Sequence, residues 1–582
     1  MLNNGYIYVD HINLSNENLN GELHEHPNPQ FKSDQFLNLN GIRDCEITKG
    51  EFDDQNLIKV QVPYAVETPL SLVNHLLEPD EFIYYKKHII LPDELNRAHV
   101  FLNFLRVDQI AEIYINGKPI GNHVGGYTNF KFDIKPYIDT NEFDLLVKVK
   151  DVTDESFYTR GKQVLNPTGW FYTSSSGIYQ TVYIEATPQE YIDEVRFTPD
   201  YDAEGVSVFV KTNTEGEASI KIGEEVFKVI TNKSQFIKLT NFHAWSINDP
   251  YLYDVLITYK EDIVHSYLGI RKVEMLEENK KPYLAINGKR VILNGFLDQG
   301  YYWLGGLTPR SYKDYEFDIK ITKELGYNTI RVHIKVEEPM FYYLCDKYGI
   351  LVIQDFPCGG DRYDFIPTVF PRLSLKLLNK EKFVTYKRYG RSDPHSREMF
   401  INEMSEIMDE TYNHPSIIIY TIFNEAWGEF DPAKMYEIFK KKDPTRLYDT
   451  ASGWLHTPKT DFYSVHSYTL PLKKRKDNKY HHPYILTETG GAGLPIKDHY
   501  IFDDFFVHTK CKNLVELEKN YVKLYSNLTK QIKSGDLIGI IYTQLNDCEK
   551  EANGILTLDR KVLKINKDVI IKLNNEINSL MK

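Results

Sequence analysis

The sequence predicts a protein of three domains, in which two β-sandwiches precede an eight-fold β/α barrel. The chain has 582 residues, which is too long for one ordinary core. Short alternating strands with turn signals fill its first part, and from about residue 282 strands alternate with helices. We therefore expect a jelly-roll sandwich at 1–188, an immunoglobulin-like sandwich at 189–273 and a (β/α)8 TIM barrel at 274–582.

Period-two alternation marks the first sandwich. Apolar residues alternate at 100–104 and again at 143–149. The strand at 112–115 runs into Asn116-Gly117, a strong hairpin turn signal. Pro188 is a plausible boundary at the end of this domain, and strands at this spacing are typical of a sandwich or jelly roll.

The second domain shows the same period-two alternation over a shorter stretch of chain. Alternating apolar residues at 206–210, 218–222 and 255–257 predict strands, and the pattern ends near Arg271. A domain of this size is typical of an immunoglobulin-like sandwich, and we expect it to act as a spacer.

The third region carries eight strand signals separated by helical patterns. The strands are expected at 290–295, 328–334, 350–355, 416–425, 447–450, 462–468, 484–488 and 537–544. Among the helices, one runs through Phe317, Ile321 and Leu325, and another begins at Asp393-Pro394, the usual order of cap and first turn. Eight strands with intervening helices favour a closed barrel.

The most informative stretch is 416–425, SIIIYTIFNE. So short and apolar a run, rich in β-branched residues, predicts a strand buried on both faces, and Glu425 stands at its carboxyl end. Glu488 ends a second such strand, YILTE. Either glutamate alone is equally well explained as a structural residue in a salt bridge or cap. Together at one barrel mouth they suit glycoside hydrolysis, in which one carboxyl protonates the leaving oxygen and the other attacks the sugar carbon.

Composition narrows the function further. The net charge of −13 argues against nucleic acid and anionic membranes as partners, because both require a basic face. The five cysteines lack metal-ligand spacing, the first residues lack the pattern of a signal peptide, and no apolar run is long enough to span a bilayer. These features predict a cytoplasmic protein with free thiols. An aromatic content of 13% suits contacts with sugar rings.

Polar side chains at the predicted strand ends are further candidates for the pocket. They are Asp298, Gln299, His333, Lys335, Asp355, Trp454, His466, Tyr468 and Gln544. For His466 and Trp454 we expect contact with sugar. For His333, Lys335 and Asp355 the sequence leaves open whether they bind substrate or form buried ion pairs that support the barrel.

The order of domains, with HPSIIIYTIFNE and ILTETGG inside the barrel, resembles glycoside hydrolase family 2 over nearly the whole chain. The resemblance implies that Glu425 is the acid/base, that Glu488 is the nucleophile and that Asn424 binds the sugar 2-hydroxyl. It also implies that Arg331 donates to Glu488 and that anomeric configuration is retained. Retention predicts carboxyl groups about 5–5.5 Å apart.

Two departures from the family bear on specificity. The region after the third strand reads IQDFPCGGDRYDF and lacks the acidic and histidine magnesium motif of the large β-galactosidases, so no metal or other cofactor is expected. The stretch EANGILTLDR lacks the Asn-x-Lys with which glucuronidases hold a uronic acid. Glucuronides are therefore disfavoured, although Lys335 or Arg362 could hold a carboxylate in another way.

The sequence thus predicts a retaining exo-β-glycosidase that hydrolyses terminal β-D-galactosides or closely related pyranosides by double displacement. The alternative within the family is a β-glucuronidase or β-galacturonidase. An inactive carbohydrate-binding protein is the alternative of another class, and the presence of both glutamates argues against it. The expected partner is a carbohydrate, and a homo-oligomer is compatible with the sequence.

Overall fold

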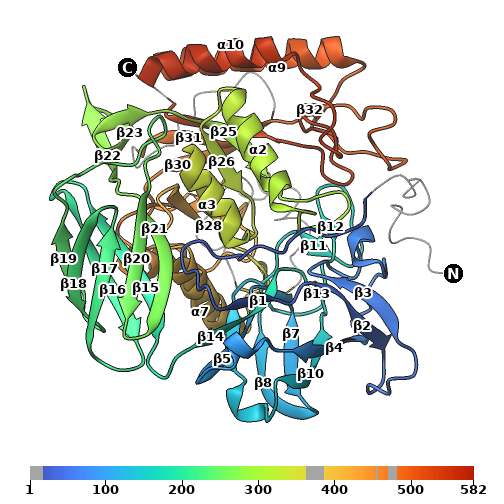
Figure 1. Cartoon of the computed structure of the whole chain (residues 1–582). Coiled ribbons are helices and arrows are strands. Elements are labelled where there is room, and N and C mark those ends of the chain that lie inside the picture. The colour runs from blue at the N-terminus through green and yellow to red at the C-terminus, as the bar shows by residue number, and fades with distance from the viewer. Residues whose placement is uncertain (1–17, 362–385, 454–455, 469–481, 536, 582) are drawn as a thin grey trace.

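The computed structural model describes residues 18–361, 386–453, 456–468, 482–535 and 537–581. Three bodies pack together, as Figure 1 shows: a first β-sandwich in blue and cyan, a second in green, and a barrel in yellow to red. The predicted succession of two sandwiches and a barrel is confirmed. The expected boundary at 188 falls between strands β14 and β15, and the one at 273 falls on the first residue of β22.

The first sandwich has two large antiparallel sheets and two further two-stranded sheets. Its strands are β1 (Phe36–Asn38), β2 (Gly41–Thr48), β3 (Ile58–Val62), β4 (Phe82–Ile90), β5 (His99–Phe104), β6 (Val107–Asp108), β7 (Ile110–Ile115), β8 (Lys118–Val124), β9 (Phe130–Asp133), β10 (Glu142–Lys150), β11 (Gln163–Val164), β12 (Tyr172–Thr173), β13 (Gly177–Ile178) and β14 (Val182–Thr187). The order β3-β2-β4-β10-β7-β8 faces the order β1-β14-β5-β9 across one apolar core. Asn116 and Gly117 make the β7–β8 turn with positive φ of 50° and 76°, as an Asn-Gly hairpin requires.

The second sandwich has seven strands. They are β15 (Ile192–Asp200), β16 (Gly205–Thr212), β17 (Glu217–Ile222), β18 (Glu225–Ile230), β19 (Gln235–Lys238), β20 (Tyr253–Tyr259) and β21 (Asp262–Leu268). They form sheets in the orders β15-β16-β19 and β18-β17-β20-β21, with one shared core. Tyr267 at its end donates to Asp346 of the barrel over 2.7 Å, so this domain is tied to the barrel by a buried polar contact.

The barrel is an eight-stranded parallel sheet. Its strands are β25 (Leu293–Asp298), β26 (Thr329–Val332), β27 (Leu351–Asp355), β28 (Ile417–Asn424), β29 (Leu447–Ser452), β30 (Tyr463–Ser467), β31 (Tyr484–Gly490) and β34 (Gly539–Thr543), and the outer helices are α2 (Tyr312–Glu324), α3 (Pro339–Tyr348), α7 (Pro394–Glu410), α8 (Pro432–Lys442), α9 (Leu514–Lys533) and α10 (Lys567–Asn578). The order β29-β28-β27-β26-β25-β34-β31-β30 closes where β29 and β30 lie against each other.

One end of the barrel is sealed. A three-stranded sheet of β22 (Val273–Glu278), β23 (Lys281–Ile286) and β24 (Lys289–Val291) shares an apolar cluster with residues that begin the barrel strands, such as Leu293 and Leu351. The amino-terminal end is therefore covered, which leaves the carboxyl ends of the strands for a site.

Local sequence explains the elements that place this site. All eight residues of β28 are buried, as its apolar run predicts. The side chain of Asp393 accepts from the amide of His395 over 2.8 Å and caps α7, which holds β28 from outside.

Helix α2 lies where the sequence predicted a helix. Phe317 is 42% exposed, whereas Tyr315, Asp318 and Ile319 are buried. The carboxylate of Asp318 is bound by Arg560 over 2.8 Å, so an ion pair contributes to the buried face of α2. In the described parts of the chain, no helix combines the length and the apolar composition needed to cross a membrane.

Candidate active site

Two glutamates meet at the open end of the barrel. Glu425 directly follows β28, and Glu488 lies in β31 next to an irregularity in its pairing with β34. One carboxylate oxygen of Glu425 lies within 4.8 Å of one of Glu488. The two carboxyl groups are therefore close enough to act on the same bond of one substrate.

The backbone at Glu425 is strained. Its φ is 52° and that of Ala426 is 69°, a left-handed conformation that side-chain-bearing residues seldom adopt. The amide of Glu425 donates to the carbonyl of Ser452 on β29 over 2.9 Å, which holds the turn. The strand thus ends abruptly and turns the Glu425 side chain over the mouth.

Arg331 of β26 organises the charges beneath the pair. Its guanidinium donates to Asp355 over 3.0 Å, to Asn424 over 2.8 Å and to Glu488 over 3.2 Å. Burial alone would lower the pKa of Arg331, but the charges of Asp355 and Glu488 raise it above its usual value. Arg331 is therefore a fixed cation that binds both Asp355 and Glu488.

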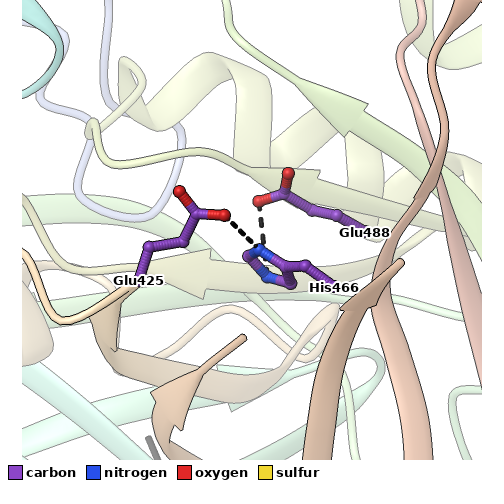
Figure 2. A group of neighbouring side chains, drawn as sticks. All are labelled: Glu425, His466 and Glu488. Atoms are coloured by element: carbon purple, nitrogen blue, oxygen red, sulfur yellow. Dashed lines mark hydrogen bonds and ion pairs between the residues drawn. The ribbon is translucent and has the colours of Figure 1, made fainter. Parts of the chain in front are cut away.

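His466 of β30 connects the two glutamates. Its Nδ1 lies 2.7 Å from Oε1 of Glu425, and its Nε2 lies 3.5 Å from Oε1 of Glu488. Figure 2 shows both carboxyl groups turned toward this ring. Tyr468 donates to the other oxygen of Glu488 over 2.5 Å. We call Arg331, Asp355, Asn424, His466 and Glu488, which are all joined through Arg331, the inner network.

The charge states of the neighbouring groups follow from burial. Burial lowers the pKa of His333 to about 3, so this ring, 2.8 Å from Asp355, is neutral. Burial opposes ionisation of Asp355 as well, but the charge of Arg331 outweighs it and lowers the pKa of Asp355. Asp449 of β29 has no such close cation, and burial raises its pKa to about 7.

The remaining sequence candidates lie at the mouth with different surroundings. Lys335 forms an ion pair of 2.7 Å with Glu337. Asp298 accepts from the amide of Gly300, and Gln544 donates to Asn553 over 2.9 Å. Trp454 lies outside the described residues, so its predicted contact with sugar stays a prediction, as do the binding roles of the others.

A loop of the first sandwich also reaches the mouth. Phe171 stacks on Trp427 at 5.3 Å, and Tyr172 donates to Glu551 in the loop after β34. Lys162 lies between these parts, with its Nζ 3.4 Å from Oε1 of Gln299 and 3.8 Å from Glu551. We call Lys162, Tyr172, Gln299 and Glu551 the rim cluster.

Sequence reasoning missed several of these side chains. It did not find Lys162, for which no local pattern gives a signal. Asp449 does have a sequence signal, because a carboxylate in the middle of a buried strand is unusual enough to mark an inward-facing polar position.

Glu425, His466 and Glu488 are also grouped closely enough to ligate a metal ion. Their donor set of one imidazole and two carboxylates would suit a divalent transition metal. The guanidinium of Arg331, however, lies 3.2 Å from Glu488 and 3.5 Å from His466, so a cation there would meet a fixed positive charge. The arrangement suits acid–base and nucleophilic chemistry better.

Comparison with known proteins agrees with this geometry. Models of the glycosyl hydrolase family 2 sugar-binding domain, the family 2 domain and the family 2 TIM-barrel domain match residues 46–188, 190–271 and 278–562. A β-galactosidase of Thermoanaerobacter pseudethanolicus is 25% identical over 508 residues, which cover 81% of this chain and 62% of that protein. A β-glucuronidase of Formosa agariphila is 25% identical over 66% of this chain and 44% of that protein. The chain therefore spans less than two thirds of the length of these relatives.

Solved structures share the fold. A β-D-glucuronidase from Dictyoglomus thermophilum superposes with a TM-score of 0.72 and 20% identity, covering 94% of this chain and 98% of that one. A β-galacturonidase from Eisenbergiella tayi bound to galacturonate superposes with a TM-score of 0.69 and 18% identity, covering 96% of this chain and 98% of that one. With family models matched in sequence to all three domains, this chain belongs to glycoside hydrolase family 2.

Proposed function

We propose that the protein is a retaining exo-β-glycosidase in which Glu488 is the nucleophile and Glu425 the acid/base. The observation that carries the proposal is the approach of the two carboxylates to within 4.8 Å at the ends of two barrel strands. At that separation one carboxylate reaches the anomeric carbon while the other reaches the leaving oxygen.

In the first step an oxygen of Glu488 attacks the anomeric carbon, and the bond to the leaving group breaks as Glu425 gives it a proton. Arg331 and Tyr468, which both donate to Glu488, fix the direction of that carboxylate. The product of this step is a glycosyl ester on Glu488.

In the second step Glu425, now a carboxylate, takes a proton from water as the water attacks the ester. The sugar leaves with its original configuration and both glutamates return to their starting states. Nδ1 of His466 lies 2.7 Å from Oε1 of Glu425, a contact that orients this carboxyl group over the mouth.

Asn424 is the expected partner of the sugar 2-hydroxyl. Its Oδ1 accepts from Arg331, which sets the orientation of the amide. Its Nδ2 is buried and has no hydrogen-bond partner among the described residues. A donor held ready in this way favours the substrate hydroxyl in the transition state.

For the sugar we propose a terminal β-D-galactoside or a related neutral pyranoside. The described lysine and arginine side chains at the mouth each have an acidic neighbour: Arg331 has Asp355 at 2.9 Å, Lys335 has Glu337 at 2.7 Å and Lys162 has Glu551 at 3.8 Å. This pairing disfavours a uronic acid, which would need a cation of its own. A β-glucuronidase or β-galacturonidase remains the alternative.

The test is hydrolysis of nitrophenyl β-glycosides that carry galactose, glucose, mannose, fucose, glucuronic acid or galacturonic acid, with Glu488→Gln as the control. We expect one neutral sugar to dominate, activity to be lost in the variant, and proton NMR to show retention in the first-formed product. An inverted product would contradict the mechanism. Absence of hydrolysis from a folded protein that still binds sugars would support the non-catalytic alternative.

A further inference from the structure

The rim cluster contains a lysine that is buried yet loosely held. Lys162 is 7% exposed, and its Nζ lies 3.3 Å from the hydroxyl of Tyr172, 3.4 Å from Oε1 of Gln299 and 3.8 Å from Oε2 of Glu551. All three separations exceed the 2.7–2.9 Å of a strong charged hydrogen bond. The ammonium therefore has unused capacity to donate.

Glu551 faces this ammonium as an equally buried carboxylate. It is 3% exposed, its Oε2 accepts from Tyr172, and its Oε1 is 3.5 Å from Nδ2 of Asn553. Burial raises the pKa of Glu551, and the charge of Lys162 opposes that rise. The charge of Lys162 thus stabilises the ionised form of Glu551, and Oε1 of Glu551 accepts only one long hydrogen bond.

The rim cluster and the catalytic pair act electrostatically on the same residue, Tyr468, whose hydroxyl donates to Glu488. Burial, followed by the negative charges of Glu488, Glu425 and Glu551, raises the pKa of Tyr468. His508 stacks on Tyr468 at 3.7 Å, and Lys162 helps to lower the pKa of His508 to about 4, behind the effect of burial.

Two amide side chains at the mouth each have one atom without a hydrogen-bond partner. These atoms are Nε2 of Gln299 and Oε1 of Gln544, which are buried and have no partner among the described residues. Gln299 follows β25 and Gln544 follows β34, which are adjacent strands. One supplies a donor and the other an acceptor, so this side of the mouth offers both halves of the hydrogen bonds that a sugar hydroxyl makes.

We propose that Lys162 and Glu551 together select a neutral sugar, Lys162 by donating to a hydroxyl oxygen and Glu551 by accepting from a hydroxyl, while the fixed carboxylate of Glu551 excludes sugar acids. The inference rests on the proposed glycosidase function and adds the residues that set its substrate class. A sugar carboxylate at this position would lie beside Glu551 with only one ammonium to share.

The first test is Glu551→Gln, which keeps the size of the side chain and removes its charge. Lys162 then has no acidic neighbour in the rim cluster and becomes a partner for a uronate. We expect the ratio of kcat/KM for nitrophenyl uronides to kcat/KM for the preferred neutral glycoside to rise at least about tenfold. Glu549→Gln is the matched control, because Glu549 lies in the same loop but accepts from the backbone of Thr173, and it should leave the ratio unchanged.

Lys162→Met is the complementary variant. It should raise KM for the neutral glycoside, and it should not raise the uronide ratio. An unchanged ratio in Glu551→Gln, or the same rise in Glu549→Gln, would overturn the proposal while leaving the glycosidase function in place.

A measurement on the unaltered protein covers the case in which Glu551→Gln fails to fold. Galactose should inhibit hydrolysis at a concentration at least tenfold lower than galacturonic acid does. Stronger inhibition by the acid, or a wild-type preference for uronides, would overturn the selection rule. Inactivity on every glycoside would instead count against the proposed function.

Discussion

The inner network and the rim cluster lie at the same barrel mouth but hold their charges differently. In the inner network Arg331 makes contacts of 2.8–3.2 Å with three partners, and every member comes from a barrel strand. In the rim cluster the ammonium of Lys162 lies 3.3–3.8 Å from Tyr172, Gln299 and Glu551, and the members come from two domains. The barrel strands alone therefore assemble the inner network, whereas the rim cluster depends on how the first sandwich packs against the barrel.

The largest expected effect is that of Glu488→Gln. Removing the proposed nucleophile should lower kcat/KM by on the order of 10⁴-fold or more for every sugar, because no neighbouring group can form the ester. Steady-state hydrolysis with thermal unfolding alongside checks this. A loss confined to one sugar would contradict the distinction between the inner network and the rim cluster, since it would make Glu488 a specificity residue.

Arg331→Met should act mainly on stability. It leaves the carboxylates of Asp355 and Glu488 buried without their cation, which costs about 3–5 kcal/mol. Urea unfolding monitored by circular dichroism measures the change. Lys162→Met should cost much less in the same experiment, and equal losses would show that the rim cluster is held as tightly as the inner network.

Tyr468→Phe removes a single hydrogen bond to Glu488. A bond to a charged group is worth about 1.5–3 kcal/mol, so kcat/KM should fall roughly tenfold to a hundredfold, and by the same factor for each sugar. The informative readout is kcat/KM on several glycosides, because a donor to Glu488 acts on the bond-breaking step that they share. An unchanged kcat/KM would mean that Tyr468 only packs against His508.

Asp449→Asn tests the electrostatics under the inner network. The pKa of Asp449 is raised by burial to about 7, from 3.8, so its contribution to stability is complete below pH 3.8 and is lost as pH rises through 7. Between pH 5 and 8 the wild type should therefore lose about 2–3 kcal/mol of stability relative to the variant. Parallel pH curves for the two proteins would contradict the buried, protonated state.

Tyr172→Phe should have the smallest effect. It removes the hydroxyl that donates to Glu551 and lies 3.3 Å from Lys162, at a cost of about 0.5–1.5 kcal/mol that falls on KM for the sugar while kcat stays near the wild-type value. Kinetics on the preferred glycoside separate the two parameters. A fall in kcat alone would place Tyr172 with the chemistry and merge the two regions.

The sequence predicted the inner network better than the rim cluster, and the reason is physical. Residues such as Glu425 and Glu488 directly end apolar strands, and a parallel barrel brings all such ends to one face. The side chain of Lys162 reaches the mouth only through the packing of two domains, which no local period encodes.

Helix α2 shows the same limit. The sequence predicted the helix, but not the burial of the Asp318 carboxylate, because its partner Arg560 lies 242 positions away in the chain. Periodicity records which residues are apolar. It does not record which charged residues meet a partner from a distant part of the chain.

The origin of Lys162 in the first sandwich also has a consequence for engineering and evolution. A chimaera that received the first sandwich of a relative would inherit a new residue at the rim while every strand-borne carboxylate stayed in place. Substrate range could then diversify by exchange of one module, without passing through inactive ancestors.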